Sequence, residues 1–115
     1  MRKNTVRAAT HSGRDVAPLF AALGDRTRLS LVSRLSHGLP TSIAQLSDGT
    51  GLTRQAVTKH LRVLQSAGLV RSSQKGRETL FELEPAPIDD IRQHLDFVSR
   101  QWDEALARLK AHIEG

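Results

Sequence analysis

Apolar positions recur every three or four residues through most of the chain. From Val16 to Leu35, and again from Thr53 to Leu64, leucine, valine and alanine return at this spacing. The spacing places apolar side chains on one face of a helix. It predicts a first helix over about residues 15–23, a second after Asp25, a short third over about residues 43–46, and a fourth after Thr53.

Residues that favour helix termini flank these segments. Asp, Thr and Ser side chains accept hydrogen bonds from the free N–H groups of a first helical turn, and glycine or proline ends a helix. The expected N-caps are Asp15, Asp25, Thr41 or Ser42, and Thr53. The expected inner face of the second helix is Leu29, Leu31, Val32 and Leu35, and that of the fourth helix is Ala56, Val57, Leu61 and Leu64.

The pattern changes between Leu69 and Leu83. Apolar and polar residues there no longer follow a helical period, and Gln74-Lys75-Gly76-Arg77 interrupts the segment with a glycine. Two short strands joined by such a turn are typical of a β-hairpin. The predicted fold is therefore mainly helical, with a small hairpin between the fourth helix and the last one.

A long apolar stripe follows Pro85 and Pro87, which we expect to break the chain. The final helix is predicted over residues 88–113, and its apolar residues keep a near-heptad spacing. At 1.5 Å per residue this helix would be about 39 Å long. Because one small body cannot cover that length, part of the stripe is expected to face another chain, although it could instead pack on the first two helices.

Composition narrows the class of protein. A length of 115 residues predicts one domain, here residues 15–115, preceded by a basic, disordered arm over residues 1–14. The chain has no cysteine, which excludes disulfides and thiolate chemistry. The basic N-terminus lacks the apolar run of a signal peptide, so we expect a cytoplasmic protein.

Charge is unevenly distributed. The formal charge is +5 overall, with about +7 in residues 1–84 and about −2 in residues 85–115. A basic body with a mildly acidic tail is typical of a protein whose body binds a polyanion, but charge alone fits a solvated basic surface equally well.

Residues 41–68 form the most informative unit. A short helix, a turn containing glycines and a longer helix make a helix-turn-helix arrangement. The predicted outer face of the longer helix carries Arg54, Gln55, Thr58, Lys59 and Arg62. Arginine and lysine pair with guanine, and glutamine pairs with adenine, in the DNA major groove. The hydroxyls of Thr41 and Ser42 open the preceding helix, where a phosphate is expected.

The hairpin after this unit strengthens a DNA-binding interpretation. Its tip is basic, and Arg71 lies on the first strand, so it resembles the wing that reaches the DNA backbone beside a recognition helix. Glu78, Glu82 and Glu84 lie on the second strand, and we expect them to face away from phosphate. These features make double-stranded DNA the leading target.

The chain resembles the ArsR/SmtB family of bacterial winged-helix repressors. The segments that carry this resemblance are ALGDRTRL, TRQAVTKHLRVLQSAGLV and KGRETLFEL, and the likeness extends from about Val16 to Ile113. The resemblance implies a winged helix-turn-helix fold and a homodimer paired through its first and last helices. It also implies that each protomer places a recognition helix in the major groove of a palindromic operator.

The resemblance and the residue pattern together define two candidate surfaces. The expected DNA-binding residues are Thr41, Ser42, Thr53, Arg54, Gln55, Thr58, Lys59, His60, Arg62, Lys75, Gly76 and Arg77. The expected dimer interface comprises Leu19, Phe20, Leu95, Val98, Trp102, Leu106, Leu109 and Ile113. For His60, contact with phosphate and packing against the body are equally open.

Metal sensing is where the chain departs from well-known members of this family. Their Cys-x-Cys pair corresponds to residues 43–47 here, which hold no thiol. On the last helix, Asp90 and His94 are four residues apart, but the family's Asp-x-His and His-x-x-Glu spacings are absent. We therefore expect no metal and no cofactor, with an Asp/His site on the last helix as the alternative.

The expected function is a sequence-specific DNA-binding transcriptional regulator that acts as a repressor and answers to an unknown small-molecule effector, if any. A winged-helix module that binds another protein is a second hypothesis, which an apolar outer face on the fourth helix would favour. An enzyme is not expected, because no nucleophile triad, carboxylate pair or phosphate-binding loop occurs at motif spacing.

Overall fold

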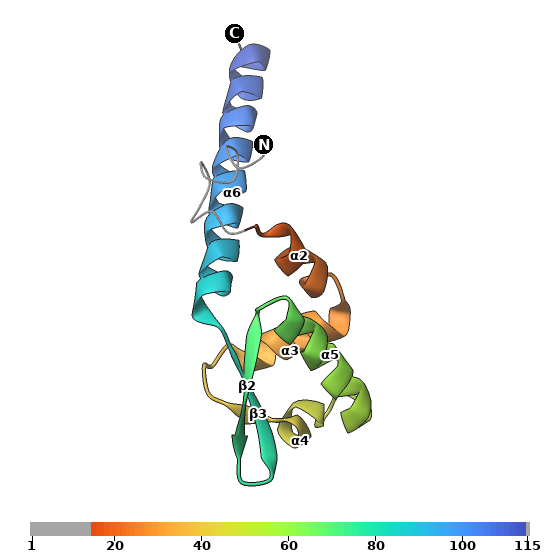
Figure 1. Cartoon of the computed structure of the whole chain (residues 1–115). Helices are drawn as coiled ribbons and strands as arrows, with labels where there is room; N and C mark the ends of the chain where they lie inside the picture. The colour runs from red at the N-terminus through yellow and green to blue at the C-terminus, as the bar shows by residue number, and fades with distance from the viewer. Residues whose placement is uncertain (1–14, 115) are drawn as a thin grey trace.

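A computed structural model describes residues 15–114, in which a small body carries one long projecting helix (Figure 1). The predicted arm over residues 1–14 lies outside the described residues. The elements in chain order are α2 (Ala17–Leu23), α3 (Arg26–Leu35), β1 (Thr41–Ser42), α4 (Ile43–Ser47), α5 (Arg54–Ser66), β2 (Val70–Lys75), β3 (Glu78–Leu83) and α6 (Pro85–Glu114). A mainly helical fold with a hairpin before the last helix is confirmed.

Three of the four predicted N-caps are confirmed. The carboxylate of Asp25 accepts from the Arg28 backbone N–H, and the Thr53 hydroxyl accepts from the N–H of Ala56. Ser42 rather than Thr41 caps α4, in a capping box with Gln45. The prediction for Asp15 was wrong, since Val16 occupies the cap position of α2, although the Asp15 carboxylate still accepts from a backbone N–H within the first turn.

The sheet has one strand more than predicted. β1, β3 and β2 form an antiparallel sheet in that order, and β1 pairs Thr41 with Phe81. A strand of two residues is too short to show an alternating pattern. The hairpin turn is also tighter than predicted, because Lys75 pairs with Glu78 and leaves only Gly76 and Arg77 in the turn. Gly76 has a φ of 62°, a conformation that favours glycine.

The hydrophobic core lies between the helices and the sheet. Residues from α2, α3, α4, α5, the hairpin and the base of α6 meet there around the fully buried Phe81. The inner face of α5 is as predicted for Val57, Leu61 and Leu64, and Ala56 is half-buried. The prediction for Leu29 was wrong: it is 52% exposed, because Leu31 and Leu35 set the buried face of α3.

The long helix α6 begins at Pro85, three residues earlier than predicted. Proline breaks a helix only where its missing N–H is needed, and the first turn of a helix leaves its N–H groups unpaired anyway. Pro85 and Pro87 therefore sit in the first turn of α6 instead of before it. Within residues 15–114, no helix is both long enough and apolar enough to span a membrane.

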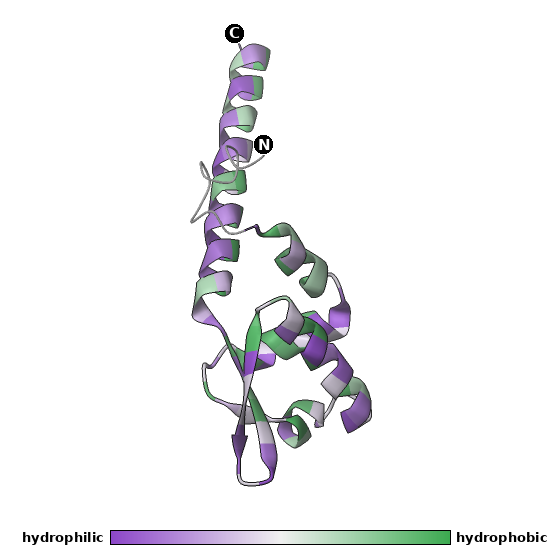
Figure 2. Cartoon of the chain, viewed as in Figure 1, coloured by the Kyte–Doolittle hydropathy of each residue, from purple (hydrophilic) through white to green (hydrophobic). Residues whose placement is uncertain are grey.

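The two ends of α6 lie in different surroundings. Ile91 is buried against the body, whereas Leu95, Trp102, Leu106, Leu109 and Ile113 are all more than half exposed. Apolar residues recur along the projecting part of the helix in Figure 2. This part of the stripe does not pack on α2 or α3, so the alternative that the whole stripe packs within one chain is wrong.

Candidate nucleic-acid interface

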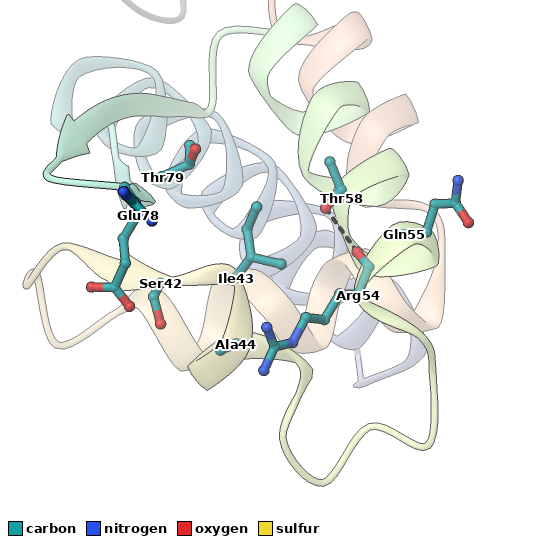
Figure 3. A pocket seen from close by; sticks show the side chains of 9 residues that line it. Ser42, Ile43, Ala44, Arg54, Gln55, Thr58, Glu78 and Thr79 are labelled. Atoms are coloured by element: carbon teal, nitrogen blue, oxygen red, sulfur yellow. Dashed lines mark hydrogen bonds between the residues drawn. The ribbon is translucent and has the colours of Figure 1, made fainter.

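A groove lies where α4, α5 and the hairpin meet (Figure 3). It has a volume of about 310 Å³ and receives side chains from the first turns of both helices and from the start of β3. Its lining residues are Ser42, Ile43, Ala44, Arg54, Gln55, Thr58, Arg77, Glu78 and Thr79. The fold thus brings together two regions that the sequence analysis assigned to DNA binding, the start of the recognition helix and the wing.

The first two turns of α5 present three exposed side chains with free donors. Arg54, Gln55 and Lys59 are exposed, and within residues 15–114 their side chains make no hydrogen bond or ion pair. Gln55 points away from the body, and the Arg54 guanidinium extends toward α4 (Figure 3). These three side chains keep their full capacity to bind an external acceptor.

The threonines of this segment serve the helix itself. The Thr53 hydroxyl accepts the N–H of Ala56 at 3.0 Å, and the Thr58 hydroxyl donates to the Arg54 carbonyl at 2.7 Å. The Thr58 hydroxyl thus donates its one proton within the helix, whereas its oxygen and methyl group can still meet another molecule.

Arg62 and His60 are held by the body. The Arg62 guanidinium donates to Gln65 and lies 5.6 Å from the centre of the Phe81 ring. His60 is half-buried, and its Nδ1 lies 3.3 Å from an Arg28 guanidinium nitrogen and 3.7 Å from the Asp25 carboxylate. Of the two possibilities for His60, the structure shows packing against the body.

Arg28 links three elements, and the sequence analysis did not single it out. Its Nε donates to the Ala22 carbonyl of α2 at 2.6 Å, while its Nη1 meets His60 of α5. The Arg28 backbone N–H that donates to Asp25 lowers the pKa of that carboxyl, and the nearby Arg28 and His60 charges act in the same direction. No local pattern identifies Arg28, because its partners lie six and 32 residues away.

The hydroxyls of the two residues expected to hold a phosphate before α4 instead form hydrogen bonds within the chain. Ser42 is only 5% exposed, and its hydroxyl takes part in the capping box of α4. The Thr41 hydroxyl donates to the Leu39 carbonyl at 3.0 Å. Their strand, β1, pairs with β3, and this pairing places Ser42 in the lining of the groove beside the wing.

The wing tip is exposed and basic. Lys75, Gly76 and Arg77 are exposed, and the side chains of Lys75 and Arg77 make no hydrogen bond or ion pair with the other residues from 15 to 114. Arg71 behaves differently, because it pairs with Glu82 at 3.2 Å and with Glu84 at 2.8 Å. Its hydrogen bond to Glu82 raises the pKa of Arg71.

The three glutamates expected on the second strand do not share one environment, and the prediction for Glu84 was wrong, because β3 ends at Leu83. Glu82 and Glu84 are paired with Arg71, and neither lines the groove. Glu78 does line it, so our expectation that all three face away from the candidate phosphate surface was wrong for this residue. In the strand register, Lys75 lies opposite Glu78 across the two-residue turn. Glu78 is therefore at the tip of the hairpin, and this position explains why it lines the groove.

The expected dimer residues separate into two groups. Leu19 is 3% exposed and belongs to the core of its own chain, and Phe20 is half-buried with its ring 5.8 Å from that of His94. Phe20 thus connects α2 to the base of α6. Leu95, Trp102, Leu106, Leu109 and Ile113 remain exposed, and Val98 is half-buried.

Groups of three or more His, Asp or Glu side chains arranged to hold a metal ion do not occur within residues 15–114. Asp90 is buried, and His94 lies against Phe20. The side chains on the base of α6 thus contribute to packing between α6 and α2.

Sequence comparison relates the chain to transcriptional regulators. A family profile described as a helix-turn-helix domain matches residues 23–73. The HTH-type transcriptional regulator Rv2034 of Mycobacterium tuberculosis is 38% identical over 87 residues, which cover 76% of this chain and 78% of that protein. The uncharacterized HTH-type transcriptional regulator YuzN of Bacillus subtilis is 40% identical over 79 residues, covering 64% of this chain and 86% of that protein.

Solved structures extend the likeness to the fold. An ArsR-like transcriptional regulator from Rhodococcus sp. RHA1 superposes with a TM-score of 0.66 at 34% identity, covering 84% of this chain and 90% of that one. The homodimeric winged helix-turn-helix DNA-binding domain of Mb0332 from Mycobacterium bovis, a possible ArsR-family regulator, gives a TM-score of 0.58 at 26% identity. It covers 81% of this chain and 82% of the other.

Proposed function

The chain belongs to the ArsR-like helix-turn-helix transcriptional regulators, and from this premise we propose that it is a homodimeric repressor of a palindromic operator. As a member of the family it is a DNA-binding transcriptional regulator with a winged helix-turn-helix fold. The family consists of regulators and not of enzymes. Beyond family membership, we propose which residues contact DNA, that the operator is a palindrome, and that the protein represses transcription.

One observation carries the assignment of the DNA-binding residues. Arg54, Gln55 and Lys59 on α5, and Lys75 and Arg77 on the wing, are exposed and have no partner among residues 15–114. Arg54, Gln55 and Arg77 line the same groove. Arg54 and Gln55 have the chemistry to read guanine and adenine edges, and the wing cations can hold the phosphate backbone.

The face of α5 argues against a module that recognises another protein. Among its large apolar residues only Val63 is exposed, and a single exposed apolar residue does not form a docking patch. The exposed residues of its first two turns are polar or cationic.

The projecting part of α6 supports the dimer. Five large apolar side chains are exposed along it, and pairing with a second copy would remove them from water. The homodimeric domain from Mycobacterium bovis has the same fold. A dimer with two-fold symmetry presents two recognition helices in symmetric orientation, so the proposed operator is a palindrome.

A repressor is the simplest regulator that this architecture can make. Residues 15–114 build one DNA-binding unit and one pairing helix, and a dimer of such units acts by occupying promoter DNA. An effector that loosens the α6 pairing would release it. Because it acts on chromosomal DNA, we place it in the cytoplasm, associated with the nucleoid.

The test is a binding titration on two duplexes over a range of salt concentrations. One duplex is selected from a random pool by the chain itself, and the other is its scrambled version with the same composition. The selected duplex should bind at least about 10³-fold more tightly, and affinity should fall steeply with salt because phosphate contacts release counterions. Equal affinity for both duplexes would contradict the proposal.

Variants locate the contacts. Arg54→Ala should cost about 1–3 kcal/mol on the selected duplex and relax the base preference at one position in each half-site. Arg62→Ala is the matched control, because Arg62 lies on the same helix but is held by Gln65 and Phe81. Lys75→Ala and Arg77→Ala should weaken both duplexes alike and flatten the salt dependence.

A further inference from the structure

Glu78 is an isolated negative charge within the candidate DNA-binding surface. It lines the groove together with Arg54 and Arg77, and its carboxylate makes no hydrogen bond or ion pair with any other residue from 15 to 114. Figure 3 shows its carboxylate extending toward Ser42 and the start of α4. Glu82 on the same strand and Glu84 just after it both pair with Arg71, so Glu78 differs from them in both position and pairing.

A carboxylate in this position affects charged and neutral acceptors differently. A phosphate that enters the groove to meet Arg54 brings its negative charge close to that of Glu78, and the two repel each other. Guanine as a whole carries no net charge, although its O6 and N7 atoms are partly negative, so contact between Arg54 and a base edge meets much weaker repulsion than contact with a phosphate. Glu78 therefore weakens the contacts that every DNA sequence can make more than those that depend on sequence.

We propose that Glu78 is a specificity-determining residue, whose carboxylate disfavours phosphates in the groove and so favours base edges as the partners of Arg54. Non-specific binding relies almost wholly on phosphate contacts, whereas specific binding adds base contacts. A residue that weakens only non-specific binding increases the ratio of specific to non-specific affinity. This inference rests on the proposed function, since it requires that the groove faces DNA.

The test compares Glu78→Gln with Glu82→Gln on the selected and scrambled duplexes used above. Both substitutions remove one negative charge from the same strand and keep the size of the side chain, but only Glu78 lines the groove. Glu78→Gln should tighten binding of the scrambled duplex about three- to tenfold at low salt and change the selected duplex less than about twofold. The gain should shrink as salt rises, because screening shortens the reach of the charge.

The matched control separates position from net charge. Glu82→Gln should change the ratio of the two affinities less than about twofold, because that carboxylate is paired with Arg71 and lies outside the groove. If Glu82→Gln lowers the ratio of selected-duplex to scrambled-duplex affinity as much as Glu78→Gln does, only overall charge matters and the inference is wrong. An unchanged ratio in Glu78→Gln would also overturn it. Glu78 is exposed, so Glu78→Gln should retain the melting temperature of the parent chain.

The outcomes for the parent chain and for the variants are independent. If the parent chain binds both duplexes equally, the proposed function fails. If the parent chain discriminates and Glu78→Gln discriminates equally well, the proposed function stands and only the role of Glu78 is rejected.

Discussion

Two helices of this protein have the same apolar period but different surroundings. Along the 13 residues of α5, Val57, Leu61 and Leu64 are completely buried in the chain's own core. Along the 30 residues of α6, the buried apolar residues are Pro87 and Ile91, both near the start. Trp102 and Ile113, farther along the same helix, are 64% and 72% exposed.

The difference shows what helical periodicity can and cannot indicate. It identifies which face of a helix is apolar, but the covering surface depends on the other elements. A helix of 30 residues is about 45 Å long, and the body reaches only its base. The recognition helix is therefore stabilised within one protomer, whereas the far part of α6 is exposed in a single chain and would be covered by a second copy in the proposed dimer.

The largest expected effect comes from disrupting the exposed stripe of α6. Trp102→Asp or Leu106→Asp would bury a charge in the proposed dimer interface, and sedimentation should then show monomers. Affinity for the palindromic duplex should fall about 10²-fold or more, because the two half-sites are no longer bound by one linked molecule. Arg100→Asp, on the opposite side of α6, is the control and should remain dimeric. An unchanged mass in both apolar-face variants would exclude α6 as the subunit contact.

A second prediction compares equal truncations in the two helices. In a monomeric Leu106→Asp background, Leu61→Ala should lower the free energy of unfolding by about 2–5 kcal/mol, measured by urea titration. Leu109→Ala in the same background should change it by less than about 0.5 kcal/mol, since an exposed side chain leaves no cavity. Similar losses for the two substitutions would mean that the far part of α6 packs on its own body.

The smallest expected effect concerns the capping of α4 within the body. Ser42→Ala removes the hydroxyl of the capping box and should cost about 1 kcal/mol in the free energy of unfolding. Ser73→Ala is the control, because Ser73 is exposed on β2 and its hydroxyl has no partner within residues 15–114. If the two variants are equally stable, the cap contributes nothing to the fold.

Much of the local structure follows from neighbouring residues. The starts of α3, α4 and α5 depend on side chains that accept hydrogen bonds from N–H groups three residues further along. The hairpin depends on one glycine in a two-residue turn. Interactions of such short range are visible in a single sequence, and this is why these elements were predicted correctly.

The candidate site was only partly predictable. Arg54, Gln55, Lys59, Lys75 and Arg77 are exposed as expected. Arg62 is exposed too, but its guanidinium bonds to Gln65 and lies against Phe81. For His60, which the sequence left open, the structure shows packing against the body. Whether an arginine is free depends on the partners that the fold brings near it. The partners of Arg62 include Phe81, 19 residues away on β3, and no helical spacing contains that information.

The sequence by itself determined the order of the elements, the apolar face of each long helix and the presence of cations at the recognition helix and the wing. These properties depend on residue type and on spacing within a few positions. Tertiary structure decided that β1 joins the wing to the start of α4, that Arg28 ties α2 to α5, and that Glu78 lines the groove while Glu82 and Glu84 pair with Arg71. Those outcomes depend on contacts between residues that are distant in the chain, and only packing of the whole body sets them.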